Sequence, residues 1–135
     1  GVFYSDQDPN YYFWQTMHGL RKEKNISPEL KIERDSVCKM SELVKSAEGI
    51  TMSAKTIEMA EYQKTKGGFR EDLVREQLRR AGFKKVNYEY FWFWQEGRVI
   101  RDLSLKAGLY FEEHLRKALP VSRGFFKYVR IIAYK

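Results

Sequence analysis

The sequence predicts an α+β fold in which an antiparallel sheet of about three strands, placed in the C-terminal half, packs against N-terminal helices. Before residue 84 the apolar residues recur mainly at helical spacing, and after it they alternate with a period of two, which is typical of strands. A chain of 135 residues with 43% hydrophobic and 32% charged residues has the size and composition of one folded domain. We therefore expect a single core of mixed helices and strands.

Residues 1–26 are predicted to form an N-terminal arm, and residues 27–135 a single α+β domain. The arm combines turn-forming residues with six aromatic side chains and shows no clean period. Its rings are Phe3, Tyr4, Tyr11, Tyr12, Phe13 and Trp14. Because free solvation of so many rings is unfavourable, we expect the arm to lie across the domain or to contact another protein subunit.

The first predicted helix begins at Ser27-Pro28-Glu29. A serine can cap the free N–H groups, proline suits the first helical position, and glutamate complements the positive end of the helix dipole. Apolar residues then recur at helical spacing up to Gly49.

Two more helices are expected before the strands. One starts at Thr51 or Ser53 and ends at Gly67-Gly68. The next, over residues 69–81, has the clearest apolar stripe, with arginines on the remaining surface. Gly82 is expected to end it as a left-handed cap.

The predicted strands span residues 84–94, 98–105 and 125–134. The first two are joined by Gln95-Glu96-Gly97, which is read as a short hairpin connection containing glycine. An amphipathic helix over residues 109–119 separates them from the last strand and is ended by a proline.

The first strand is exceptionally aromatic. Residues 86–94 read V-N-Y-E-Y-F-W-F-W, which puts large rings on both faces of a strand. One face can build the core while the other meets another layer, a partner or a stacked ligand.

The formal net charge is +7 and the isoelectric point is about 9.5. Such a charge attracts phosphate backbones, anionic membranes or acidic proteins, and it also serves solubility alone. The single cysteine, Cys38, permits no intrachain disulfide and favours a reducing intracellular compartment, either the cytoplasm or an organelle matrix. No apolar run approaches the ~20 residues of a membrane span, so none is expected.

No catalytic signature stands out. His18 and His114 are the only histidines, and the run Glu112-Glu113-His114 points its side chains to diverging sides of a helix, so no metal site is expected. Gly67-Gly68 precedes a helix and could offer N–H groups to a phosphate, although a turn between helices explains it better. We predict no cofactor, and the sequence leans against an enzyme without deciding the question.

Basic residues from the third helix into the aromatic strand form the candidate nucleic-acid-binding surface. If they share a face with exposed rings, they would combine phosphate contacts with base stacking. The candidates are Arg70, Arg75, Arg79, Arg80, Lys84, Lys85, Tyr88, Tyr90 and Trp92. The alternative is that the rings form the core and the cations a solvated rim.

The stretch L-R-R-A-G-F-K-K-V-N-Y, residues 78–88, and the ending K-Y-V-R-I-I-A-Y-K, residues 127–135, resemble the closing part of class I S-adenosylmethionine-dependent methyltransferases. The resemblance implies a helix, a turn at A-G-F and two final antiparallel strands, and it covers about the last third of the chain. The family's cofactor site, a glycine-rich loop after the first strand and an acid after the second, has no counterpart here. The resemblance therefore implies a fold without carrying over the activity.

The first expectation for function is a basic, non-catalytic module that binds RNA or acts within a ribonucleoprotein. Two alternatives remain open: a structural subunit of a larger protein complex, and a methyltransferase-like remnant or small enzyme.

Overall fold

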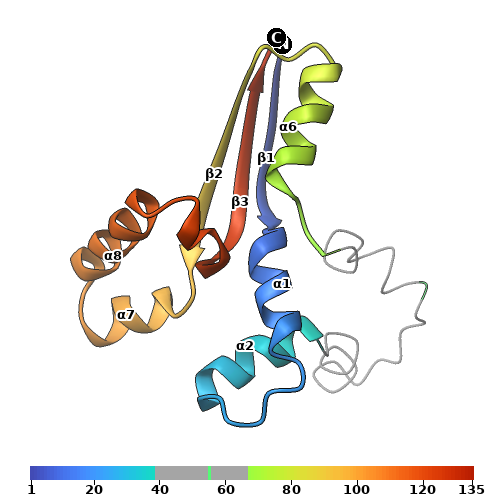
Figure 1. Cartoon of the computed structure of the whole chain (residues 1–135). Helices are drawn as coiled ribbons and strands as arrows, with labels where there is room; N and C mark the ends of the chain where they lie inside the picture. The colour runs from blue at the N-terminus through green and yellow to red at the C-terminus, as the bar shows by residue number, and fades with distance from the viewer. Residues whose placement is uncertain (39–54, 56–66) are drawn as a thin grey trace.

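The computed structural model of the chain describes residues 1–38, 55 and 67–135. Its elements in chain order (Figure 1) are β1 (Val2–Pro9), α1 (Tyr11–Gly19), α2 (Pro28–Cys38), α6 (Glu71–Arg80), β2 (Lys85–Phe93), α7 (Glu96–Asp102), α8 (Leu105–Lys117), the 3₁₀ helix η1 (Val121–Phe125) and β3 (Phe126–Tyr134). The helix predicted from residue 51 or 53 and the last part of the helix predicted from residue 27 lie outside the described residues.

A three-stranded antiparallel sheet of order β1-β3-β2 forms the centre of the described structure. The C-terminal strand β3 lies between the other two and runs antiparallel to both, so β1 and β2 are parallel to each other. The termini meet at one end of the sheet, where the Lys135 amide donates a hydrogen bond to the Gly1 carbonyl oxygen at 3.0 Å (Figure 1).

The α+β class and the three-stranded antiparallel sheet are confirmed, and the strands predicted at residues 84–94 and 125–134 correspond to β2 and β3. The placement of all strands in the C-terminal half is wrong, because β1 comes from the N-terminal segment that was predicted as an arm. Its alternation is hidden in the sequence by a bulge between Ser5 and Asp8, where Gln7 has a φ of 57°.

The strand predicted at residues 98–105 is also wrong. This segment forms most of α7 and the start of α8 instead. Gln95, at a φ of 66°, turns the chain out of the sheet, and Ser104 caps α8 by accepting a hydrogen bond from the Ala107 amide at 3.0 Å. Val99 and Ile100 gave the segment its strand-like appearance. Val99 packs against the main core, and Ile100 lies close to Gly108 of α8.

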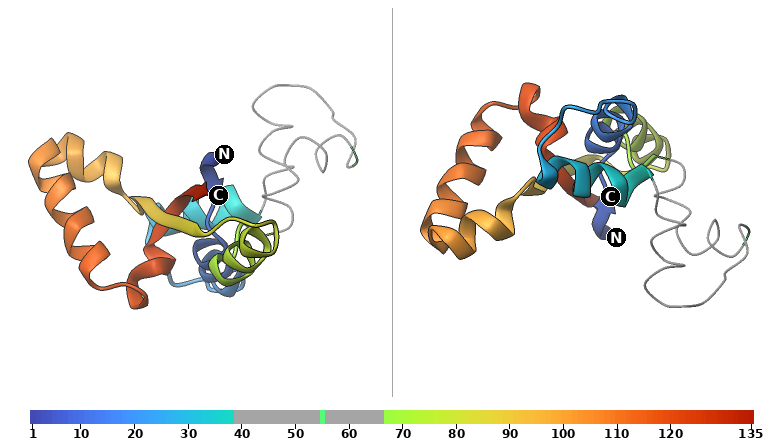
Figure 2. Two further views of the ribbon diagram at one scale, coloured as in Figure 1. Left: turned by 90° about the horizontal axis from the view of Figure 1, so that it is seen from above. Right: turned by 90° about the horizontal axis from the view of Figure 1, so that it is seen from below.

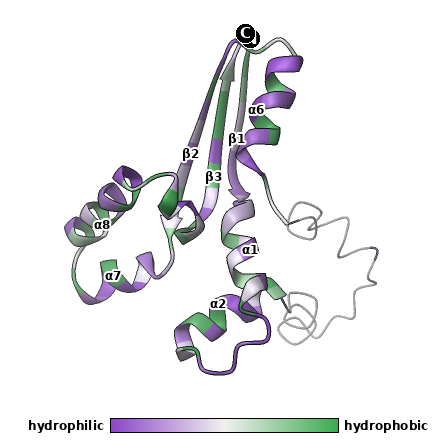
Figure 3. Ribbon diagram, viewed as in Figure 1, coloured by the Kyte–Doolittle hydropathy of each residue, from purple (hydrophilic) through white to green (hydrophobic). Residues whose placement is uncertain are grey.

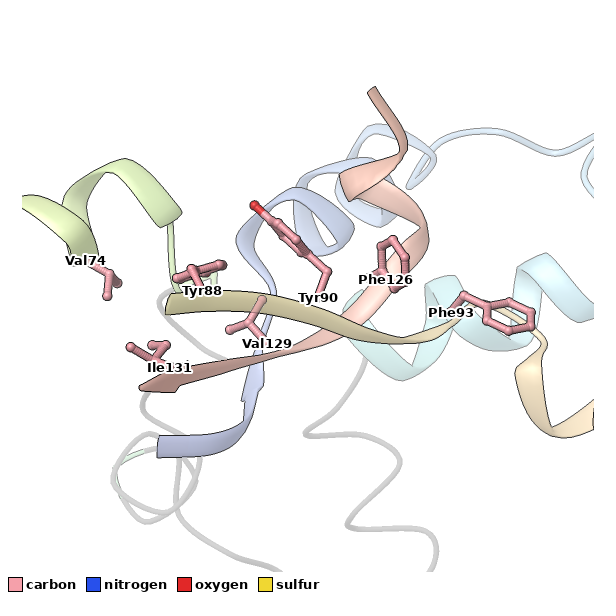
Figure 4. Close-up of a cluster of buried hydrophobic side chains, with 7 residues drawn as sticks. All are labelled: Val74, Tyr88, Tyr90, Phe93, Phe126, Val129 and Ile131. Atoms are coloured by element: carbon pink, nitrogen blue, oxygen red, sulfur yellow. The ribbon is translucent and has the colours of Figure 1, made fainter. Parts of the chain in front are cut away.

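The main core lies between the sheet and the helices on one of its faces (Figure 4). Its buried side chains are Val74 of α6, Tyr88, Tyr90 and Phe93 of β2, and Phe126, Val129 and Ile131 of β3. Leu115 and Leu119, in and after α8, pack against its edge. The predicted alternation holds for Tyr88 and Tyr90 but fails beyond them, because the left-handed backbone at Trp92 (φ 57°) brings Phe93 into the same cluster.

A second, smaller cluster lies beyond the sheet. It joins Phe13, Trp14 and Met17 of α1 to Val37 of α2, with Trp94 packed against them. Helices α7 and α8 form a separate hairpin that extends away from α1 and α6 (Figure 2). The helices that follow β1 and those that follow β2 thus lie on two sides of the molecule.

The turn at Gly67 and Gly68 is held against β1. The Phe69 amide donates to the Pro9 carbonyl oxygen at 2.7 Å, and the Tyr11 amide donates to the Phe69 carbonyl oxygen at 3.1 Å. A Cβ on Gly68 would lie 2.4 Å from the Pro9 oxygen, so this close approach requires glycine. Because the Phe69 amide is already bonded, the turn joins two elements and does not offer that group to a phosphate.

Candidate functional site at the carboxyl ends of the parallel strands

The carboxyl ends of β1 and β2 lie at the same end of the sheet, opposite the termini (Figure 1). From there α1 and α2 follow β1, and α7 and α8 follow β2. The helices that leave the sheet therefore gather at this end, where a cleft lies among the described residues.

A cleft at this end lies between the start of α2 and α7, with a volume of about 280 Å³. Three apolar side chains, those of Trp94, Val99 and Leu103, line it together with five polar or charged residues. The lining residues are Ser27, Glu29, Trp94, Gln95, Arg98, Val99, Asp102 and Leu103.

An ion-pair chain spans the cleft. Nη1 of Arg98 lies 2.7 Å from Oε1 of Glu29 on α2, and its Nε lies 3.4 Å from Oδ2 of Asp102. Asp102 is also bound by Nε of Arg101 at 2.6 Å. The Arg101 hydrogen bond lowers the pKa of Asp102, and a backbone N–H together with Arg98 lowers the pKa of Glu29, so both carboxyl groups are ionised at neutral pH.

Unusual backbone conformations flank the cleft. Trp92 and Gln95 have φ angles of 57° and 66°, values that cost a non-glycine residue roughly 1–2 kcal/mol. Between them, the indole Nε1–H of Trp94 is buried and has no hydrogen-bond partner among the described residues. Strained backbone and an unsatisfied donor at one place favour a functional role for this segment.

Asp8 is a buried acid near the carboxyl end of β1. It is 5% exposed, and its carboxylate accepts a hydrogen bond from the Ser5 hydroxyl. Burial raises its pKa above the ordinary value for aspartate, although the Ser5 bond opposes this shift.

Two of the predicted nucleic-acid-binding residues, Tyr88 and Tyr90, belong to the core. Their exposures are 8% and 4%, and their hydroxyls donate to the Phe69 carbonyl oxygen at 2.9 Å and to Oε2 of Glu71 at 2.6 Å. Burial raises the pKa of both phenols. The rings of Tyr88 and Tyr90 thus form part of the core, which was the alternative interpretation of the sequence. Buried in this way, these two rings offer no surface for base stacking.

Three of the predicted arginines are engaged by neighbouring carboxylates. Arg70 pairs with Asp72, Arg75 with Glu71, and Arg80 with Glu76. These pairs neutralise most of the basic face that was predicted on this helix.

The remaining predicted cations, Arg79, Lys84 and Lys85, are exposed and make no ion pair within the described part of the chain. Lys85 lies 5.8 Å from the centre of the Tyr134 ring. Trp92 is 49% exposed but lies at the opposite end of β2. Lys84 and Lys85 thus lie at the end of β2 near the termini, and Trp92 lies at the other end.

One charged feature was not among the residues predicted from the sequence. The loop between α1 and α2 contains the run R-K-E-K, residues 21–24, and these residues border a groove with Lys31 and Arg34 of α2. The sequence did contain a signal for this charged loop, because three of its residues 21–24 are cationic.

His18 and His114 lie on different helices, and Nδ1 of His18 is 3.7 Å from Sγ of Cys38. Across residues 1–38, 55 and 67–135, no three or more His, Cys, Asp or Glu side chains gather as a metal site would require. No helix within the same residues is long and apolar enough to cross a membrane. Comparisons with models of protein families, with curated proteins and with solved structures found no match to the chain.

Proposed function

We propose that the chain is the closing section of a fold like that of class I S-adenosylmethionine-dependent methyltransferases, and that the cleft between α2 and α7 lies on its substrate side. The cofactor would be held by polypeptide other than the described residues. The observation that carries this proposal is the antiparallel pairing of the last two strands, β2 and β3, after α6 and the turn at residues 81–83, as the resemblance implies.

The sequence resemblance supports the same assignment. Its first stretch covers the end of α6, the turn at Ala81-Gly82-Phe83 and the start of β2, and its second covers β3. Gly82 has the left-handed conformation (φ 87°) that a turn after a helix requires. The resemblance implies a helix, this turn and two final antiparallel strands, and α6, β2 and β3 have this arrangement.

The described residues supply no counterpart of the family's cofactor loop. Asn10, the first residue after β1, uses its side chain to cap α1 and to bind two backbone carbonyls. β2 leads directly into α7 beside the cleft, whereas β1 leads into α1 and reaches the cleft only through α2. The chain is accordingly suited to form a substrate-side wall and not to bind the cofactor alone.

The test is calorimetric titration of S-adenosylmethionine into the 135-residue chain and into the longer natural polypeptide that the proposal requires to contain it. We expect binding to the natural polypeptide and none to the chain. ATP is the matched control ligand, because it shares the adenosine group and is attracted to any basic protein. A natural polypeptide that fails to bind S-adenosylmethionine, or binds ATP equally well, would contradict the proposal.

RNA binding is the second candidate, supported by cations and rings at the end of the sheet near the termini. Lys84, Lys85 and Lys135 are exposed and make no ion pair with a described residue. The ammonium group of Lys135 lies 5.6 Å from the centre of the Phe83 ring, and Tyr134 is 39% exposed. Proteins that bind single-stranded RNA combine positive charges with accessible aromatic rings in this way.

The corresponding test measures binding of labelled single-stranded RNA as a function of salt. The triple variant K84Q/K85Q/K135Q should lower the salt slope by about 2, because each phosphate contact on a single strand contributes roughly 0.7. Replacing Tyr134 by alanine should weaken binding with little change of slope. Absence of salt-dependent binding by the wild-type chain would exclude this candidate.

A further inference from the structure

We propose that the groove between the α1–α2 loop and α2 is a binding site for the phosphate groups of an anionic ligand. This groove shares no lining residue with the cleft, although both lie beside α2, and it is at the opposite end of the molecule from the termini (Figure 1). The inference goes beyond both candidate functions and depends on neither.

The groove is defined by charge. It has a volume of about 530 Å³ and is lined by Arg21, Lys22, Glu23, Lys24, Lys31 and Arg34. Five of these six residues are cationic. Figure 3 shows that most of the loop between α1 and α2 is hydrophilic.

The loop is fixed by bonds that leave its charged groups available. The amide of Arg21 donates to the His18 carbonyl oxygen at 3.1 Å, and the amide of Glu23 donates to the Leu20 carbonyl oxygen at 3.0 Å. From α2, Nη1 of Arg34 donates to the Glu23 carbonyl oxygen at 2.8 Å. Arg34 is only 9% exposed, so a nearly buried guanidinium holds the loop in place.

Glu23 is the one acidic residue among the described residues that line the groove, so positive charge there exceeds negative charge. Arg34 is paired with Asp35 at 2.8 Å, whereas Arg21, Lys22, Lys24 and Lys31 are exposed and make no ion pair with a described residue. The arginines of α6 differ, because three of them have acidic partners. Like charges held this close repel one another, and a multivalent anion relieves that repulsion.

Phosphate fits this groove better than a single carboxylate. The cations come from the loop and from α2, where Lys31 and Arg34 are three residues apart and lie on one face of the helix. Linked phosphates can contact several of them at once through charge-assisted hydrogen bonds. Such phosphates come either from a small oligophosphate or nucleotide, or from a nucleic-acid strand.

The experiment compares two double variants with the same change of net charge. K22Q/K24Q removes two cations of the groove, and K106Q/K117Q removes two cations of α8, which takes no part in either candidate binding surface. All four lysines are exposed, so both variants should fold, and an unchanged melting temperature checks this. The probe is inorganic tripolyphosphate, titrated by calorimetry at low ionic strength.

We expect the groove variant to lose affinity for tripolyphosphate by roughly tenfold or more, and the α8 variant to stay within about twofold of the wild type. No binding by the wild-type chain, or equal losses in both variants, would overturn the proposal. Labelled oligouridylate then distinguishes the sources. Displacement of tripolyphosphate by the oligonucleotide indicates a nucleic-acid strand, and no displacement indicates a small phosphate ligand.

Discussion

Asn10 joins three parts of the chain through one side chain. It is fully buried, and its Oδ1 accepts the Tyr12 amide at 3.1 Å, which caps α1. Its Nδ2 donates to the carbonyl oxygens of Arg123 and Phe126 at 2.7 and 2.6 Å. The N-terminal and C-terminal segments are thereby fixed to each other beside the carboxyl end of β1.

Replacing Asn10 should be among the most damaging single changes in the chain. Asn10→Ala removes a helix cap, worth about 1 kcal/mol, and leaves two carbonyl groups without donors at roughly 1–3 kcal/mol each. We expect a total loss of about 3–7 kcal/mol in urea denaturation. Asn10→Asp keeps the cap acceptor but lacks the donor, so it should also destabilise. An Asp variant as stable as the wild type would show that the Nδ2 bonds contribute nothing.

Asp8 should make stability depend on pH in the direction opposite to that of a salt-bridged carboxylate. Its pKa is raised by burial in the folded chain, so folding favours the protonated form. This stabilisation is present below the unfolded value, about 4, and is lost as pH rises through the raised folded value. Asp8→Asn should therefore raise the melting temperature at neutral pH and change it little in acid.

The effect on stability is measured by thermal melts of the wild type and of Asp8→Asn, from acid to neutral pH. Ser5→Ala serves as the control, since losing the Ser5 hydrogen bond removes support for the ionised carboxylate and should steepen the loss with pH. Parallel wild-type and Asp8→Asn curves would contradict the assignment.

At the scale of elements, α6 is joined to the sheet at both of its ends by glycine. The turn at Gly68 contacts Pro9 of β1, and Gly82 leads from α6 into β2. Both glycines have positive φ angles, but only Gly68 has a neighbouring atom within 3 Å of where a Cβ would stand. A substitution at Gly82 therefore tests backbone strain alone, and a substitution at Gly68 tests backbone strain together with a steric clash.

The pair Gly68→Ala and Gly82→Ala tests this difference. Gly82→Ala should cost about 1–2 kcal/mol from the left-handed conformation alone. Gly68→Ala should cost clearly more, because its methyl group must displace the Pro9 carbonyl and break the link between α6 and β1. Chemical denaturation of both variants gives the comparison, and equal costs would refute the role of the contact.

The sequence predicted those elements whose signals are local. Ser27 and Pro28 begin α2 as expected, and the Leu30 amide donates to the Ser27 hydroxyl at 3.2 Å. The apolar stripe of residues 69–81 corresponds to α6, and the helix predicted at 109–119 corresponds to α8, which starts earlier at Leu105. These segments follow spacing and capping rules that a single sequence carries.

The features that the sequence could not predict depend on contacts distant in the chain. β1 is a strand because it pairs with β3, more than a hundred residues away, and its bulge hides the alternation. The cleft likewise depends on a distant pairing, that of Arg98 with Glu29. The sequence allowed Tyr88 and Tyr90 to be either exposed for base stacking or buried in the core. Their burial depends on the position of α6 over β2, which the sequence does not show.

At the scale of the whole molecule, the N-terminal segment is part of the folded core. β1 forms one edge of the sheet, and Phe13, Trp14 and Met17 of α1 are buried. Most of the chain therefore has to be present before the central strand β3 gains both of its neighbours. Such dependence between distant segments is typical of a cooperative domain.

Deleting residues 1–20 should consequently abolish cooperative thermal unfolding. The deletion exposes one side of β3 and removes three residues of the second cluster. Circular dichroism melts measure the transition. The matched control is Val2→Lys with Tyr4→Lys, since these side chains are 65% and 58% exposed and should tolerate charge. A truncated chain that keeps a sharp transition would support the arm predicted from the sequence.

The meeting of the two termini has a mechanical consequence. β1 and β3 run antiparallel from the point where Lys135 bonds to Gly1, so a force pulling the ends apart acts across the strands and not along them. The hydrogen bonds would then open one pair after another, as in a zipper, instead of resisting together in shear. In a chain pulled by its ends, β1 and β3 would separate at a low force, beginning with the pair Val2 and Tyr134. The cleft, at the opposite end of the sheet, would be disrupted last.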